Sequence, residues 1–289
     1  MNIKPKYKGI FYIILSAFCF AFMNAFVRLA GDIPSIQKCF FRNFVAVFFA
    51  LGILLKKHEG FHIENGCFVP LLFRAIFGTL GIVCNFYAID HLVLSDASML
   101  NKMSPFFVII FSYIILKEKL SFFQGMAVIT AFIGSLFIIK PSFSNMALIP
   151  SVIGFAGGMC AGLAYCLVRM LGNKGQNGSF IVFFFSTFSC LVTLPYLILN
   201  YHPMTFAQIL ALLGAGLAAS GGQFSITAAY FHSPAREISV YDYSQIIFAA
   251  MLGFIMFDQI PDVYSIIGYV IICTTAIVMF VKNNAIHSN

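Results

Sequence analysis

Charged residues are scarce in this sequence. They make up 9% of its 289 residues, whereas about 25% of the residues of a typical soluble domain are charged. Hydrophobic residues make up 61% of the chain, and the mean hydropathy is +0.94. So few charges cannot cover the surface of a water-soluble fold of this length. The composition therefore excludes a soluble all-helical protein and indicates an integral membrane protein.

The sequence also lacks the motifs of an intramembrane enzyme and of an ATP-driven pump. It contains no HExxH, no phosphate-binding loop and no GxSx arrangement with a helix-borne histidine partner. Tyr241-Asp242 is similar to the first half of an intramembrane aspartyl protease site, but no second aspartate in a GxGD setting accompanies it. We therefore predict a protein that is not an enzyme, with no catalytic residues and no cofactor.

Cysteine and histidine are present, but not in the spacing of a metal or redox site. The eight cysteines form no CxxC pair and are scattered through apolar stretches, so they are interpreted as small buried hydrophobic residues rather than as disulfides or metal ligands. The six histidines lie in or near the expected loops. A proton relay through histidine is therefore not expected.

Long apolar runs dominate the chain. A helix that rises 1.5 Å per residue needs about 20 apolar residues to cross about 30 Å of hydrocarbon. We predict an all-α membrane protein with ten transmembrane helices, over residues 9–30, 35–55, 67–89, 94–116, 121–140, 149–171, 178–200, 205–230, 236–257 and 261–281. The connections between these runs are short and carry Gly, Pro and polar residues, so nearly all of the chemistry must lie within the lipid bilayer.

The basic residues of the connections predict the orientation. With a cytoplasmic N-terminus, the inner loops and tails hold Lys4, Lys6, Lys8, Lys56, Lys57, Lys117, Lys119, Lys174, Arg236 and Lys282, whereas the outer loops hold little beyond Lys38 and Lys140. We expect both termini inside, in a cytoplasmic (inner) membrane of the bacterial type. The net charge of +7 reflects basic loops attracted to anionic lipid and is no argument for nucleic acid.

The first apolar run follows basic residues, as a secretory signal does. Its length exceeds that of a signal's apolar region, no convincing small-residue cleavage site follows it, and it has a counterpart at 149–171. We therefore interpret it as a retained first span.

Two stretches recur at a separation of about 140 residues. Residues 88–121 align with 228–261, and residues 19–31 align with 160–172. Two nearly equal offsets at opposite ends of one unit indicate a duplicated half-chain, although chance similarity between hydrophobic helices is the alternative.

The predicted repeats are residues 1–145 and 146–289, with five spans each. Because five is odd, the second repeat would enter the membrane from the opposite face. Two inverted five-helix repeats are typical of secondary transporters, in which a site near the midplane lies between the halves.

Several short motifs carry a family resemblance. They are Phe40-Phe41-Arg42-Asn43, the stretch 74–81, Phe86-Tyr87-Ala88, Ser104-Pro105-Phe106 and Leu116-Lys117-Glu118-Lys119-Leu120. Together with the five-plus-five layout over essentially the whole chain, they resemble the EamA branch of the drug/metabolite transporter superfamily. The glutamate at the end of the fourth span recurs as Asp258, a departure that keeps the charge.

The resemblance implies a function and a site without naming one substrate. It implies a carrier of small metabolites, often amino acids or their derivatives and frequently exported. It also implies a central cavity lined mainly by helices 1, 3, 4, 6, 8 and 9.

Polar side chains inside the apolar spans mark a candidate pathway, because hydrocarbon satisfies no polar group and a mid-helix charge costs about 2.5 to 3.5 kcal/mol on insertion scales. Their helical spacing would let them face one cavity. The candidate substrate-binding residues are Asn24, Asn85, Ser98, Asn101, Lys102, Gln223, Tyr241, Asp242 and Gln245. For Asn85, a hydrogen bond between helices is the commoner use.

Lys102 and Asp242 occupy matched positions in the two halves. The functional hypothesis is that they flank the pathway, with Lys102 attracting a carboxylate or another anionic group and Asp242 attracting an amine or a coupling proton. A buried ion pair that only fixes helix packing is the alternative.

Arg42 and Arg74 are the candidate gating or pathway residues, because both lie within or near the ends of apolar runs. Arginine can instead extend to the membrane interface, and this interpretation is favoured for Arg28 and Arg169.

The sequence thus predicts a secondary active transporter of a small polar metabolite, such as an amino acid or an amine derivative, working by alternating access. Its expected partners are a small-molecule substrate, the lipid bilayer and protons, with proton coupling or exchange as the driving force. A channel or a structural membrane component remains the alternative, ahead of an intramembrane enzyme. The substrate, the direction and the stoichiometry are undetermined, and a homodimer is left open.

Overall fold

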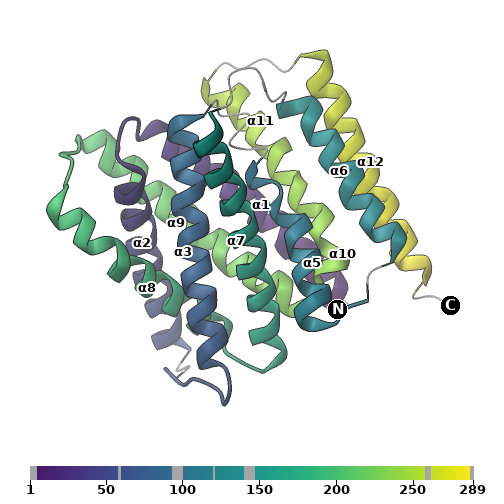
Figure 1. Ribbon diagram of the computed structural model, residues 1–289, viewed down its shortest axis with the longest axis horizontal. Coiled ribbons are helices and arrows are strands. Elements are labelled where there is room, and N and C mark those ends of the chain that lie inside the picture. The colour runs from purple at the N-terminus through teal and green to yellow at the C-terminus, as the bar shows by residue number, and fades with distance from the viewer. Residues whose placement is uncertain are drawn as a thin grey trace.

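The computed structural model describes residues 5–57, 60–92, 100–119, 121–139, 147–257 and 262–286, and all regular elements in these ranges are helices. They are arranged as Figure 1 shows. The helices are α1 (Pro5–Leu29), α2 (Ser35–Lys56), α3 (Phe68–His91), α5 (Ser104–Leu116), α6 (Phe122–Ile139), α7 (Leu148–Asn173), α8 (Gly178–Leu199), α9 (Phe206–His232), α10 (Ala235–Ile238), the 3₁₀ helix η1 (Ser239–Tyr243), α11 (Ser244–Phe257) and α12 (Val263–Ile286).

The helical segments have the length and composition of membrane spans. Within the described ranges, eight are long and apolar enough to cross a bilayer, one of them being Ala235–Met256, which runs from α10 into α11. Two shorter apolar helices, Ser104–Leu116 and Phe122–Ile138, fall within the fourth and fifth predicted runs. The predicted all-helical membrane protein is therefore confirmed.

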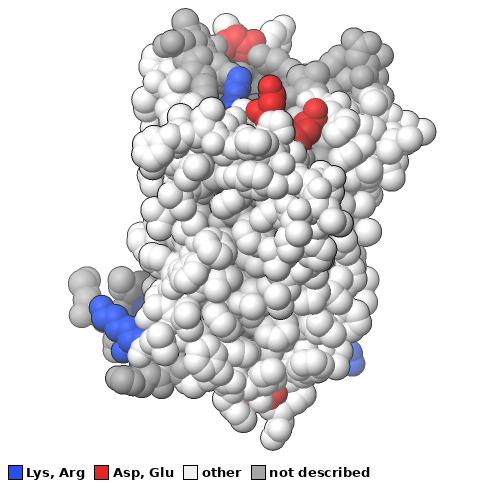
Figure 2. Space-filling model, turned by 90° about the vertical axis from the view of Figure 1, so that its left-hand side faces the viewer, with Lys and Arg blue, Asp and Glu red and all other residues white. Residues whose placement is uncertain are grey.

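The outer surface is apolar. Large hydrophobic side chains such as Phe122, Leu148 and Leu199 are mostly exposed. In the face shown in Figure 2, the charged side chains lie near the two ends of the molecule, and the band between the ends carries none. Exposed apolar area is unfavourable in water at roughly 25 cal/mol per Å², but it is not in hydrocarbon. This surface therefore suits a lipid environment.

Helices from the first part of the chain pack against helices from the second part. Helix α1 packs along α9, α3 along α7, α2 along α8, and α6 along α12, while α5 contacts α7 and α11 contacts α1. In Figure 1, α2 and α8 lie at one edge, and α6 and α12 at the other.

Close contacts give the direction of two of these pairs. The start of α1 meets the end of α9, where Gly9 lies against Ser233, and the end of α1 meets the start of α9, where Phe26 lies against Gly214. Likewise the end of α3 meets the start of α7, where Ala88 lies against Gly154. Both pairs are therefore antiparallel.

The start of α1 and the end of α12 lie on the same side of the helical bundle. The rings of Tyr7 in α1 and Phe280 in α12 are 5.7 Å apart, centroid to centroid. Helix α1 begins and α12 ends at the same end of the helical bundle, as an even number of crossings requires.

Two predicted helices are interrupted. The sequence predicts spans over 94–116 and 236–257. In the structure a turn at residues 102–103 precedes α5, and residues 235–257 are divided into α10, η1 and α11. Pro105 lies in the first turn of α5, where its missing N–H needs no partner; deeper in a helix it would remove a backbone hydrogen bond. The described parts of these two predicted spans are therefore helical, but each contains an interruption that the sequence did not indicate.

Candidate functional site

A cavity lies between helices from the first part of the chain and helices from the second part. Its walls come from α1, α2, α3, α7, α8 and α9, and from the chain around both interruptions. The centre of a water molecule can occupy about 80 Å³ of it. The polar and charged side chains of its lining are Asn24, Arg42, Arg74, Asn85, Asn101, Lys102, Ser104, Tyr165, Gln223, Asp242 and Gln245.

The two interruptions meet in this cavity through Lys102 and Asp242. The ammonium of Lys102 donates to Oδ2 of Asp242 at 3.2 Å and to Oε1 of Gln245 at 2.7 Å. The side chains of the pair are 10% and 11% exposed. The matched positions found in the sequence therefore form a buried ion pair in this conformation.

Backbone groups join the same network. Lys102 also approaches the carbonyl oxygen of Asp242 at 3.4 Å, and the hydroxyl of Tyr243 donates to the carbonyl oxygen of Lys102 at 3.2 Å. An interrupted helix leaves carbonyl groups without their usual N–H partners, and inside a membrane other protein groups must supply them. A side chain from each interruption thus donates to a backbone carbonyl oxygen of the other.

Arg42 of α2 and Arg74 of α3 are buried in the cavity wall, each only 2% exposed. Arg42 donates from Nε to the sulfur of Met23 at 3.2 Å and from Nη1 to Oδ1 of Asn43 at 3.4 Å. Neither arginine extends to the outer surface, so the alternative in which they reach the membrane interface does not describe this structure.

Arg74 is held by one hydrogen bond and one aromatic ring. Its Nη2 donates to Oε1 of Gln223 at 3.0 Å, and its guanidinium carbon lies 4.1 Å from the centroid of the Phe185 ring. A Cβ at Gly78, one turn further along α3, would collide with Nη1 of Arg74. The glycine leaves the space that the guanidinium occupies.

Ion pairs lie toward both ends of the bundle. At the end where α5, α7 and α9 finish, Arg169 pairs with Glu118 at 3.4 Å and donates to the carbonyl oxygens of Tyr230 and Phe231 at 2.9 and 3.1 Å. At the opposite end, where α2 starts and α3 finishes, Lys38 pairs with Asp90 at 3.4 Å. Arg169, which the sequence places at the membrane interface, connects α7 to α9 and to the residues that follow α5 at this end of the bundle.

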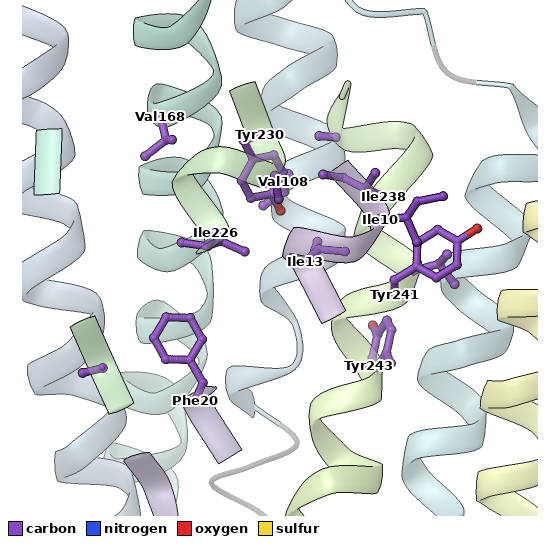
Figure 3. Close-up of a cluster of buried hydrophobic side chains, with 14 of the residues drawn as sticks. Ile10, Ile13, Phe20, Val108, Val168, Ile226, Tyr230, Ile238, Tyr241 and Tyr243 are labelled. Carbon is purple, nitrogen blue, oxygen red and sulfur yellow. The ribbon is translucent and has the colours of Figure 1, made fainter. Parts of the chain in front are cut away.

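Most of the predicted site residues line the cavity, and one described residue, Tyr241, does not. Ser98 lies outside the described residues. Tyr241 is 5% exposed and belongs to the apolar core rather than to the cavity lining, and its hydroxyl has no hydrogen-bond partner among the described residues. Figure 3 shows Tyr241 beside Ile10 in this core. The reason is η1: a 3₁₀ helix has 3.0 residues per turn instead of 3.6, which rotates side chains away from the faces predicted for an α-helix.

Sequence reasoning missed Tyr165 of α7, which lines the cavity and whose ring stacks on Tyr230 at 5.7 Å. A single tyrosine in an otherwise apolar run is usually a core residue. The alignment of residues 19–31 with 160–172 sets Tyr165 opposite Asn24, a predicted site residue, and this was the available signal. The apolar lining residues Phe20 and Phe185 carried no signal that distinguishes them from lipid-facing phenylalanines.

Comparison with known proteins identifies the family. Residues 7–140 match the EamA-like transporter family. The chain is 32% identical over 273 residues to the pseudopaline exporter CntI of Pseudomonas aeruginosa, covering 94% of this chain and 95% of that protein. The chain belongs to the EamA-like transporter family. It is a membrane transporter and not an enzyme, as the sequence predicts.

A more distant relative and a solved structure are also similar to this EamA-like chain over most of its length. Human solute carrier family 35 member G1 is 25% identical over 274 residues, covering 90% of this chain and 75% of that protein. A solved crystal structure with 11% sequence identity superposes with a TM-score of 0.81, covering 96% of this chain and 98% of that one. At that identity the likeness speaks for the fold alone.

Proposed function

We propose that this EamA-like chain is a secondary active carrier that moves a small polar metabolite through the cavity by alternating access. The observation that carries the proposal is the cavity itself, in which charged and polar side chains from both parts of the chain converge within otherwise apolar helices. Charges within spans are costly and mark substrate or ion pathways.

Inverted five-helix repeats, 1–145 and 146–289, are part of the proposal, and the helix contacts support them. In the two repeats α1 corresponds to α7, α3 to α9 and α5 to α11. A two-fold rotation that exchanges the repeats therefore turns the contact of α1 with α9 into that of α7 with α3, and the contact of α5 with α7 into that of α11 with α1. All four contacts are present. The packing therefore has the reciprocity that a two-fold relation between the repeats requires.

The helix directions support inversion. Successive spans alternate in direction, so α1 and α3 run the same way. Helix α9 is antiparallel to α1, and it is therefore antiparallel to α3, its counterpart in the repeat. A duplicated pair that crosses in opposite senses is the geometry of inverted-repeat transporters.

The ion pairs toward the two ends are suited to gating. Glu118–Arg169 joins one repeat to the other, whereas Lys38–Asp90 joins α2 to α3 within the first repeat. In the proposed cycle, the pairs at one end break while those at the other end remain closed. The solute then gains access to the two sides of the membrane in turn.

The Lys102–Asp242 pair is the proposed coupling element. A proton or a substrate amine that takes the place of Lys102 on the Asp242 carboxylate would open the link between the two interruptions. The helices that follow them could then move separately. This assigns Asp242 the role that the sequence hypothesis gave it, while Lys102 acts as its partner in the closed state.

Export across a cytoplasmic membrane, with both termini inside, completes the proposal. It is supported by the relative named as an exporter and by the start of α1 and the end of α12 lying on one side of the bundle.

Counterflow in proteoliposomes tests the proposal. Vesicles holding the purified chain are loaded with unlabelled solute, and entry of the labelled solute is followed for amino acids, amines, carboxylates and pseudopaline. A carrier gives saturable, transient accumulation that Asp242→Asn abolishes and the exposed-site control Lys174→Gln retains. Flux that rises linearly without accumulation would indicate a channel, and no flux of any solute would contradict the proposal.

A further inference from the structure

Resting on the proposed function, we propose that Arg42 and Arg74 form an anion subsite that binds a carboxylate of the transported substrate. The cavity would then select solutes that carry a negative charge. This goes beyond the sequence hypothesis, which assigned the anionic group to Lys102.

The charges of the cavity do not balance without a ligand. Its described lining holds three cations, Arg42, Arg74 and Lys102, and one anion, Asp242, which leaves a formal charge of +2. The Asp242 carboxylate already pairs with Lys102 at 3.2 Å. No carboxylate within the described part of the chain pairs with either arginine. Because a buried charge without a counter-ion is costly, the cavity favours an anion from outside.

The hydrogen-bonding capacity of the two guanidinium groups is also largely unused. A guanidinium has five N–H donors. Nε of Arg74 is buried without a partner among the described residues, and only its bond to Gln223 is well formed. Arg42 donates to a thioether sulfur, a weak acceptor, and to Asn43 at the long distance of 3.4 Å. Both groups can therefore donate strong bonds to an incoming oxyanion.

The surroundings of Arg74 favour a planar anion. Phe185 covers one face of the guanidinium, and Gly78 packs against Nη1. The Nε that has no partner lies at the edge of the planar guanidinium. The N–H groups along such an edge can donate two parallel hydrogen bonds to the two oxygens of a carboxylate. Lys102, by contrast, is already engaged by Asp242 and Gln245, so the arginines are the better anion site in this conformation.

Thermal unfolding of the purified full-length chain in detergent tests the subsite without knowledge of the substrate. Malonate is the probe, its neutral isostere malonamide is the matched control, and sodium chloride holds the ionic strength constant. A ligand that binds only the folded state raises the Tm. We expect malonate to raise the Tm of the wild type, and malonamide not to.

The variants assign the effect to the arginines. Arg42→Gln and Arg74→Gln are each expected to weaken malonate binding about tenfold or more, because each removes charged hydrogen-bond donors. Lys174→Gln removes one charge from the surface and should leave malonate binding unchanged. Each variant is compared with its own ligand-free Tm, so a purely structural role for the arginine does not affect the result. Should a Gln variant fail to fold, Arg42→Lys or Arg74→Lys takes its place, which keeps the charge and should weaken binding less.

Three outcomes would overturn the inference. The first is a wild-type Tm that malonate raises no more than the chloride control. The second is Gln variants that keep the wild-type response. The third is stabilisation by inorganic phosphate but not by malonate, which would assign the subsite to tetrahedral oxyanions. Loss of the subsite with counterflow intact leaves the carrier proposal in place, whereas arginine-dependent malonate binding without any transport would contradict the carrier alone.

Discussion

At the scale of single residues, four largely buried charged side chains line the cavity. Lys102 and Asp242 satisfy each other, while Arg42 and Arg74 have no acidic partner within the described ranges. The sequence predicted all four as pathway residues, because charges within apolar runs are rare. It offered a buried Lys102–Asp242 ion pair as the alternative to a functional role, and it could not decide between the two, since that depends on how the helix segments come together.

The Lys102–Asp242 pair predicts strong coupling between its members. Removing either partner leaves the other as an uncompensated buried charge, at a cost of about 3 to 5 kcal/mol. Lys102→Ala and Asp242→Asn should each lower the Tm in detergent, and the double variant should be more stable than the sum of the two losses implies. A double-mutant cycle measures this coupling; strictly additive losses would show that the pair contributes nothing.

Gly78 predicts a residue-scale effect on Arg74. Gly78→Ala adds a Cβ where Nη1 of Arg74 lies, so the guanidinium must move and malonate binding should weaken roughly tenfold, or about 1.4 kcal/mol. Gly52→Ala is the matched control, because a Cβ at that position of α2 meets nothing within 4 Å. Equal malonate affinity in both variants would contradict the placement of the guanidinium.

At the scale of elements, the positions of the helices were predictable and the two interruptions were not. An apolar run of about 20 residues defines a span, so the ten runs identify the helical segments. The 3₁₀ helix η1 differs from an α-helix in its number of residues per turn, 3.0 instead of 3.6. Over five residues the spacing of apolar positions cannot distinguish these two periods. Tyr241 was therefore assigned to the cavity, although η1 directs it into the core.

The ion pair of Glu118, which follows α5, is expected to control access to the cavity from one side of the membrane. Glu118→Gln removes the charge that holds Arg169 across the two parts of the chain. In a background without native cysteines, a reporter Ala164→Cys in the cavity wall should react faster with a membrane-impermeant maleimide added from the side of Glu118. Asp90→Asn, at the opposite end, should speed the reaction from the other side only. The same rate increase from both sides with either variant would exclude a gating role.

At the scale of the whole molecule, the central claim is that one polar cavity is exposed to the two faces in turn. The sequence indicated this through two offsets of about 140 residues, and the reciprocal, antiparallel packing of α1 with α9 and of α3 with α7 supports it. Family membership agrees with transport. The cavity volume and the exact lining could not be predicted, because they depend on residues such as Tyr165 and Phe185 whose sequence context resembles that of core residues.

Distances between spin labels at the two ends test this claim most directly. One pair of labels, at Asp32 and His202, reports on the end where α2 starts; a second pair, at Lys119 and Lys174, reports on the opposite end. The measurement is made in proteoliposomes by double electron–electron resonance, with and without a solute that shows counterflow. Alternating access predicts that one distance lengthens as the other shortens; two distances that stay fixed, or that lengthen together, would contradict it.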